Sequence, residues 1–202
     1  MKKIKKILIG THNKGKVKEI SYLLNKKIKK ISPIQLKIKS PIENGKNFQS
    51  NSELKAKYFF RKSKIVTISD DSGLCIDCLD GKPGIFSARW AKKYGGFNQA
   101  MLKIIQLIKN KNKNKKTRNT KAKFVCSLTL YLSSKKKFTT TGEINGNISN
   151  KILGNNGFGY DPIFLPKGYN NSFGEMSIIE KNEIAHRSKA VKKLINYLSK
   201  FC

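Results

Sequence analysis

The fold is decided near the start of the chain, in the stretch KIKKILIGTHNKGKVKEISYLL at residues 3–24. Residues 3–9 are rich in β-branched and apolar side chains, which predicts a first strand. A polar loop follows at residues 10–16. Val17, Ile20 and Leu24 then recur at helical spacing, so we expect a helix directly after the loop. A strand, a loop and a helix in this order indicate an α/β protein.

The same patterns continue along the chain. They predict strands at residues 28–38, 65–69, 122–132 and 138–148, the last two joined by a turn at 133–137, and helices at 50–62, 97–108 and 183–201. Strands and helices interleave without strict alternation, so we expect an α/β fold with a long mixed sheet and flanking helices. Residues 109–123 are rich in Asn and Lys and indicate a solvated linker within one domain at residues 1–202.

The charge of the chain is strongly unbalanced. Lys and Arg number 43 against 12 Asp and Glu, a formal net charge of +31 over 202 residues. Such a field attracts nucleic acids, so a basic nucleic-acid-binding protein is one alternative. However, lysine supplies 39 of the 43 positive charges, whereas dedicated nucleic-acid readers usually draw on arginine. Lys, Ile and Asn share A/T-rich codons, and we favour compositional drift over specific nucleic-acid binding.

Other classes are excluded by the same composition. No stretch approaches the roughly 20 apolar residues of a membrane span, and the N-terminal apolar run is too short for a secretion signal. Four cysteines are too few for a disulfide scaffold at this length. We therefore expect a cytoplasmic protein without membrane contact.

The first candidate site is the loop GTHNKGKV at residues 10–17. It opens a helix, where backbone N–H groups and the helix dipole favour an anion. It nearly matches the phosphate-binding pattern G-x4-G-K-[ST], but Val17 stands where a hydroxyl should hold magnesium. A phosphate loop therefore remains possible, a standard P-loop NTPase does not, and an ordinary polar turn is the alternative.

The second candidate is SDDSGL at residues 69–74. Carboxylates bind hard cations such as Mg²⁺. Neighbouring side chains on a strand point to opposite faces, so Asp70 and Asp71 should have different roles, and spacing does not decide which one faces a site. An Asp-rich turn is the alternative.

Two further segments carry candidate ligand contacts. In NNGFGYDP at residues 155–162, glycines flank Phe158, which offers a stacking face to a flat ligand. Lys181 and the pair His186–Arg187 offer donors to a base carbonyl or a phosphate. The alternatives are a tight turn with core aromatics and a solvated helix cap.

Taken together, these motifs resemble one family. SDDSGL at residues 69–74, LDGKPGIFSAR at 79–89 and GFGYDPIF at 157–164, in this order after the loop at 10–17, are similar to the non-canonical purine nucleoside triphosphate pyrophosphatases, and the resemblance covers residues 7–194. It implies two lobes around a central nucleotide cleft and, usually, a homodimer. It also implies Mg²⁺-dependent hydrolysis of ITP, dITP or XTP to the monophosphate and pyrophosphate.

The resemblance also implies roles for individual residues. Asp71 matches the catalytic proton acceptor and metal ligand, Glu43 is the available second metal ligand, and Ser72 matches a substrate contact. The residues that match triphosphate contacts are Thr11, His12, Asn13, Lys14, Gly15, Lys16 and Lys55. The residues that match contacts to the purine are Phe158, Gly159, Tyr160, Asp161, Lys181, His186 and Arg187.

The sequence departs from the family pattern in three places. One acid, Glu43, replaces the usual pair before the second helix, Ser50-Asn51-Ser52 replaces Glu-Asn-Ala, and Ala185 replaces a serine before His186. These changes affect predicted metal and base contacts and leave Asp71 and the phosphate loop intact. A Maf-type pyrophosphatase acting on modified pyrimidine nucleotides is the enzymatic alternative.

Overall fold

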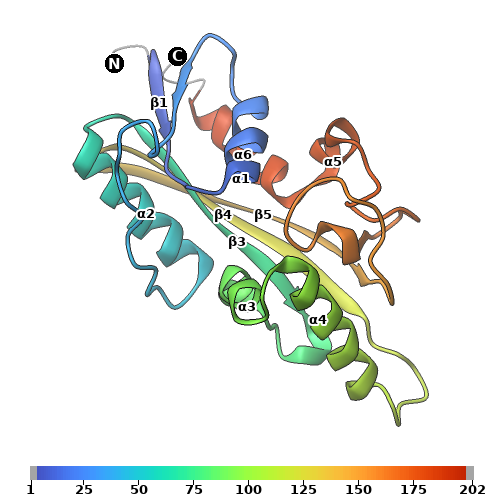
Figure 1. Cartoon of the computed structure of the whole chain (residues 1–202). Helices are drawn as coiled ribbons and strands as arrows, with labels where there is room; N and C mark the ends of the chain where they lie inside the picture. The colour runs from blue at the N-terminus through green and yellow to red at the C-terminus, as the bar shows by residue number, and fades with distance from the viewer. Residues whose placement is uncertain (1–3, 199–202) are drawn as a thin grey trace. The chain divides into compact units, whose positions relative to one another are not determined.

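The computed structural model describes residues 4–198 (Figure 1). Its strands are β1 (Lys6–Ile9), β2 (Lys29–Ile31), β3 (Thr67–Ile76), β4 (Lys121–Ser133), β5 (Lys136–Ile148) and β6 (Phe164–Pro166). Its α-helices are α1 (Lys14–Leu23), α2 (Phe48–Ser63), α3 (Ser87–Lys93), α4 (Phe97–Lys111), α5 (Ile178–Ile184) and α6 (His186–Leu198). Single 3₁₀ turns lie at Asp77–Leu79, Gly84–Phe86 and Asp161–Ile163. No helix within these described residues is both long and apolar enough to cross a membrane.

The strands form one mixed sheet in the order β2-β1-β3-β4-β5-β6. β1 is parallel to both β2 and β3, and β5 is antiparallel to β6. Because two residues join β4 to β5, these neighbouring strands form an antiparallel hairpin. The predicted α/β fold with a mixed sheet and flanking helices is confirmed.

The chain divides into two compact units. Unit 1 comprises Met1–Asp71, Cys126–Gly142 and His186–Cys202, and unit 2 comprises Ser72–Val125 and Glu143–Ala185. Strands β3, β4 and β5 each run from one unit into the other. The two predicted site segments that follow Asp71 and precede His186 therefore belong to unit 2.

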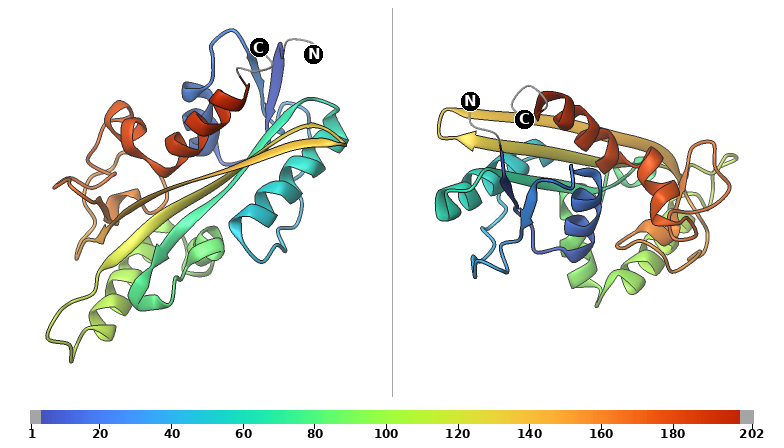
Figure 2. Two further views of the ribbon diagram at one scale, coloured as in Figure 1. Left: turned by 180° about the vertical axis from the view of Figure 1, so that it is seen from behind. Right: turned by 90° about the horizontal axis from the view of Figure 1, so that it is seen from above.

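Unit 1 is built around the first strand–loop–helix segment. Ile7 and Ile9 of β1, Ile20 of α1 and Leu128 of β4 are buried in one apolar cluster with Val191 of α6. Helix α1 packs against α6, as Figures 1 and 2 show. The cluster holds the start of α1, and with it the predicted phosphate loop, in a fixed place beside β1.

Unit 2 has its own core. The apolar face of α4, with Met101, Ile104 and Ile108, is buried in a cluster that also contains Phe124 and Phe164. The rings of Phe124 and Phe164 lie 4.7 Å apart between centroids, a typical packing distance for aromatic pairs. Helix α3, which the sequence patterns did not predict, packs against α4.

The strand predicted at residues 28–38 is much shorter than expected. β2 ends at Ile31, and Pro33 then begins a turn in which its carbonyl accepts bonds from the N–H groups of Leu36 and Ile38. The alternating pattern was therefore wrong beyond Ile31. Proline has no N–H group for a sheet ladder and favours turns, which explains the early end.

The strand predicted at residues 65–69 is longer than expected. β3 starts at Thr67 and continues through both aspartates to Ile76, so the polar motif lies inside a strand rather than in a turn after it. The final predicted helix is interrupted, because Ala185 has an extended backbone with ψ of 153° between α5 and α6. Residues 199–201 of that predicted helix lie outside the described residues.

The Asn- and Lys-rich linker predicted at residues 109–123 is also shorter. Helix α4 continues to Lys111 and β4 begins at Lys121. The loop between them is held by Asn112, whose amide nitrogen donates to the carbonyl oxygens of Ile108 at 2.8 Å and Asn119 at 3.1 Å. The predicted linker is thus a hydrogen-bonded loop at residues 112–120, and the rest of it belongs to α4 and β4.

Candidate active site

The predicted phosphate loop lies between β1 and α1 in unit 1. A Cβ atom at Gly10 would come within 2.1 Å of Ser69 Oγ, so only glycine allows the loop to pass this close to β3. Asn13 caps α1 by accepting a hydrogen bond from the N–H of Lys16 at 3.0 Å, and Thr11 Oγ1 accepts one from the N–H of Asn13 at 3.2 Å. The start of the helix is therefore fixed by its own side chains, as a preorganised anion site requires.

The remaining loop residues flank this cap. Lys14 and Gly15 form the first turn of α1. His12 shares a hydrogen bond of 2.6 Å with Ser40, and its ring lies 6.0 Å from that of Phe59. The structure thus keeps all six predicted phosphate-loop residues in one short segment of unit 1.

Asp70 lies at the centre of a buried charge cluster in unit 1. Its Oδ2 atom is 3.0 Å from Lys16 Nζ and 3.3 Å from Arg187 Nη2, and Arg187 also binds the carboxylate of Glu19. Burial alone would raise the pKa of Asp70, but Lys16 and Arg187 outweigh it and hold that pKa well below its usual range. Two carboxylates therefore face two cations in this cluster, which fixes the head of the phosphate-loop lysine.

Asp71 has different partners, as the alternation of side chains on a strand requires. Its Oδ1 atom is 3.6 Å from Lys55 Nζ, and Glu43 Oε1 is 2.8 Å from the same nitrogen. Burial raises the pKa of the Asp71 carboxyl, with Lys55 and Lys16 opposing it and Glu43 adding to it. For Lys55, burial lowers the pKa, but Asp71, Asp70 and Glu43 outweigh it, so the pKa is raised. Lys55 thus stays charged between two acids.

This arrangement fits a divalent cation. Mg²⁺ usually takes one or two carboxylates and fills its other positions with water and substrate phosphates. Glu43 and Asp71, both at the same ammonium group, provide two carboxylates. Within residues 4–198, no group of three or more His, Cys, Asp and Glu side chains is placed to hold a metal ion. Asp71 and Glu43 are therefore the residues that could provide carboxylate ligands to such an ion.

Asn51 is a site residue that the sequence patterns did not single out for a role. Its Nδ2 atom donates to Asp71 Oδ2 at 3.0 Å, and its Oδ1 atom accepts from the N–H of Gly45 at 2.7 Å. It therefore orients the Asp71 carboxylate and also fixes the segment that follows Glu43. An amide in the first turn of the helix that carries Lys55 is the signal that could have identified it.

The serine next to Asn51 anchors the same helix. Ser52 Oγ lies 3.1 Å from Ser127 Oγ and 2.8 Å from Thr129 Oγ1, both on β4 in unit 1. Where the resembling family usually has alanine, this chain thus ties α2, and with it Asn51 and Lys55, to the sheet.

The predicted base-binding loop belongs to unit 2 and is organised by Asp161. Its Oδ2 atom accepts a hydrogen bond of 2.7 Å from the N–H of Phe158 and one of 2.5 Å from Lys181 Nζ. Gly157 has φ of 74°, and a Cβ atom there would come within 2.1 Å of Asp161 Oδ2. Lys181 Nζ also lies 4.9 Å from the centroid of the Phe158 ring, a cation–π distance. The loop and Lys181 are thus one connected group.

The other predicted residues have clear places. The Tyr160 hydroxyl donates to the carbonyl oxygen of Ser87 at 2.9 Å, and burial raises its pKa, so Tyr160 supports the loop from within. Gly159 has φ of 71° and Ser72 is a half-buried residue of β3 in unit 2. His186 and Arg187 start α6 and belong to unit 1, whereas Lys181 belongs to unit 2. The three were predicted as one set and are divided between the units.

Comparison with known proteins identifies related chains. A family model described as the Ham1 family matches residues 7–197. A dITP/XTP pyrophosphatase of Zymomonas mobilis is 38% identical over 191 residues, covering 94% of this chain and 90% of that protein. One of Oceanobacillus iheyensis is 36% identical over 198 residues, covering 96% and 98%. Among solved structures, a HAM1 protein from Coxiella burnetii matches with a TM-score of 0.86 at 29% identity, covering 96% of this chain and 98% of that one.

Proposed function

The chain belongs to the Ham1 family, and we propose that it hydrolyses the non-canonical purine triphosphates ITP, dITP and XTP to the monophosphate and pyrophosphate. The observation that carries this proposal is the group of Asp71, Lys55 and Glu43, where one buried ammonium is shared by two carboxylates. The relatives named dITP/XTP pyrophosphatases support the choice of substrate. Removing such nucleotides would clear damaged purines from the nucleotide pool.

The triphosphate would be held by the loop from Thr11 to Lys16 and by Lys55. A nucleoside triphosphate carries about four negative charges, which must be screened before a nucleophilic water can approach the α-phosphorus. Lys16 and Lys55 provide fixed positive charge, because each is already held by a carboxylate of the protein. The N–H groups at the start of α1 add donors that need no reorganisation when the phosphates arrive.

Asp71 and Glu43 are the residues that would hold Mg²⁺. When bound, this ion supplies positive charge that neutralises phosphate oxygens and the leaving pyrophosphate. Asp71 orients the attacking water and accepts its proton. Asn51 keeps one oxygen of this carboxylate in a fixed direction.

Selectivity for the purine would come from Phe158, Lys181, His186 and the Ser72 contact. Donors aimed at a 6-oxygen are left unpaired by the amino group of adenine, and a mispaired polar contact rejects an analogue strongly. Arg187 shares this task in the resembling family. Here its guanidinium binds Glu19 and Asp70, so we propose that it acts on the substrate through Asp70 and Lys16.

A nucleotide panel tests the proposal. With Mg²⁺, the purified chain should hydrolyse ITP, dITP and XTP far faster than ATP or GTP and release pyrophosphate, and EDTA should stop the reaction. Release of orthophosphate would contradict attack at the α-phosphorus. Faster hydrolysis of UTP, CTP or TTP would favour the Maf-type alternative. By the same resemblance we propose a cytoplasmic homodimer without specific nucleic-acid or membrane contact, and light scattering of the purified chain tests the dimer.

A further inference from the structure

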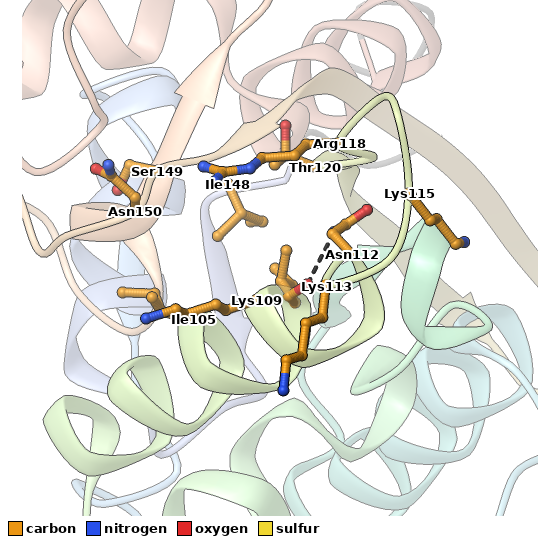
Figure 3. A pocket seen from close by; sticks show the side chains of 11 residues that line it. Ile105, Lys109, Asn112, Lys113, Lys115, Arg118, Thr120, Ile148, Ser149 and Asn150 are labelled. Carbon is orange, nitrogen blue, oxygen red and sulfur yellow. Dashed lines mark hydrogen bonds between the residues drawn. The ribbon is translucent and has the colours of Figure 1, made fainter.

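A cavity lies within unit 2, apart from the candidate active-site residues. It has a volume of about 590 Å³ and lies between the end of α4, the loop at residues 112–120 and the segment at residues 148–150 (Figure 3). This volume is within the range of roughly 300–1,000 Å³ of small-molecule sites. None of the residues that line it belongs to the charged clusters around Asp70 and Asp71 or to the loop organised by Asp161.

The loop that closes this pocket is held in place by a buried amide. Asn112 is 6% exposed, donates through Nδ2 to Ile108 and Asn119, and accepts through Oδ1 from the N–H of Asn119 at 2.8 Å. The N–H of Ile148 binds the carbonyl of Thr120 at 2.9 Å, which ties the far end of the loop to β5. The pocket wall is thus a built part of unit 2.

Asn112 also occupies the end of α4. The carbonyl end of a helix carries partial negative charge and repels anions. Here the carbonyl of Ile108 accepts from both the backbone N–H and the side-chain amide of Asn112, and that of Lys109 accepts from the same backbone N–H. The carbonyls of Ile108 and Lys109 therefore already have donors, which weakens their effect on the pocket.

The charged side chains around the pocket are Lys109, Lys113, Lys115 and Arg118, all cations. Figure 3 shows Arg118 reaching from the loop toward Ser149 and Asn150, and Lys109 on the other side of the pocket, whereas Lys113 and Lys115 point outward. In the described part of the chain, no carboxylate lies within 4.0 Å of Lys109 or Arg118. Two cations on opposite sides of a hollow favour an anion between them.

The rest of the lining is apolar or uncharged. Ile105, Ile108 and Ile148 contribute apolar surface, and Ser149 and Asn150 bring polar groups. None of the lining residues in the described part of the chain is aromatic, although stacking on aromatic rings is how proteins usually hold the bases of single strands. The shape and lining thus favour a small molecule over a nucleic-acid strand.

We propose that this pocket binds a phosphorylated small molecule of nucleotide size. Its phosphate lies between Lys109 and Arg118, and its apolar part contacts the isoleucines of the lining. Arginine and lysine both bind phosphate oxygens through charge-assisted hydrogen bonds. The proposal concerns residues 105–150 alone and holds whether or not the chain hydrolyses purine triphosphates.

Titration calorimetry of the full chain with AMP tests this site, with adenosine and inorganic phosphate as partial probes. AMP should bind more tightly than either partial probe, because each of them uses only one half of the pocket. The double variant K109Q/R118Q should weaken AMP binding at least about tenfold. The matched control K111Q/K116Q removes the same charge from the same helix and loop at exposed residues outside the pocket, and should change AMP binding less than about twofold.

Three results would overturn the proposal. The first is no binding of AMP to the unaltered chain at up to roughly 5 mM. The second is equal loss in the two double variants, which would indicate the general positive field. The third is an RNA oligonucleotide that binds more tightly than AMP and depends on the same pair of residues, which would assign the pocket to a nucleic acid. Unchanged ITP turnover in K109Q/R118Q would show that the loss of AMP binding is local to the pocket.

Discussion

Lys16, Lys55 and Arg187 of unit 1 lie largely buried against carboxylates, whereas Lys109 and Arg118 of unit 2 are exposed and have no carboxylate within 4.0 Å in the described part of the chain. A buried charge must be compensated by the protein itself, so the first set is fixed before any substrate arrives and is coupled to folding. The second set remains hydrated and adds little to stability. The buried cations are therefore part of the folded structure, whereas the exposed cations are free to bind a ligand.

The largest expected effect comes from Asp71, the carboxylate that pairs with Lys55 of the first set. Asp71→Asn keeps the shape and removes the proton acceptor and metal ligand, so turnover of ITP should fall at least about a thousandfold. Steady-state hydrolysis measures this, and circular dichroism should show an unchanged fold. Asp77→Asn, the same change at an exposed residue, is the control and should keep full activity. Full activity of Asp71→Asn would remove Asp71 from its proposed role.

The next effect contrasts the two arginines directly. Arg187→Met leaves Asp70 and Glu19 buried with less compensation and should lower the free energy of unfolding by about 3–5 kcal/mol. Arg118→Met, the same change at an exposed residue, should alter it by less than about 0.5 kcal/mol. Urea unfolding of both variants measures the difference. Equal losses would mean that the buried cluster does not hold unit 1 together.

A smaller effect is expected at Asn51, which touches Asp71 but carries no charge. Asn51→Ala removes the hydrogen bond to the Asp71 carboxylate and should lower kcat roughly 10- to 100-fold, since hydrogen bonds to charged groups contribute about 1.5–3 kcal/mol. KM for ITP should change much less, because Lys16 and Lys55 remain. A control at the exposed Asn110 should have no effect. A rise in KM alone would assign Asn51 to substrate binding instead.

The smallest effect concerns an exposed ion pair of unit 1. Burial alone would raise the pKa of Glu53, but Lys137 and Gln49 outweigh it, so the pKa lies below its ordinary value of 4.5. A carboxyl whose pKa is lowered by folding stabilises the protein above that ordinary value and loses the effect as the pH falls through the folded pKa.

The exposed pair should therefore contribute only about 0.2–1 kcal/mol near neutral pH. Unfolding of Glu53→Gln and of the unaltered chain should differ by this amount at about pH 7 and should converge as the pH falls through the lowered pKa of Glu53. A difference that grew toward low pH would contradict the assignment. Together with Arg187→Met, this variant measures how burial changes the value of an ion pair.

The sequence predicted those parts of the fold whose cause is local. The first strand, the loop at residues 10–16 and helix α1 follow from apolar spacing, and the hairpin of β4 and β5 follows from alternation around a short turn. The family resemblance supplied most of the candidate site residues for the same reason, because motifs are local in sequence.

Long-range compensation was beyond the reach of these patterns. SDDSGL has the composition of a turn, yet it lies inside β3, because Lys16, Lys55 and Arg187 neutralise its acids from distant parts of the chain. The bond from Arg187 to Glu19 spans 168 residues of sequence. Tertiary contacts of this kind override local preference. The same holds for Asn51, whose role depends on a strand twenty residues away.

The course of β3 through Asp70 and Asp71 limits how this protein can evolve. Successive positions of a strand face opposite ways, so inserting or deleting a single codon just upstream would exchange the surroundings of the two acids. Asp71, the proposed proton acceptor, would then face Arg187, and Asp70 would face Lys55. Lineages of this protein should therefore keep the number of residues between Thr67 and Asp71 constant.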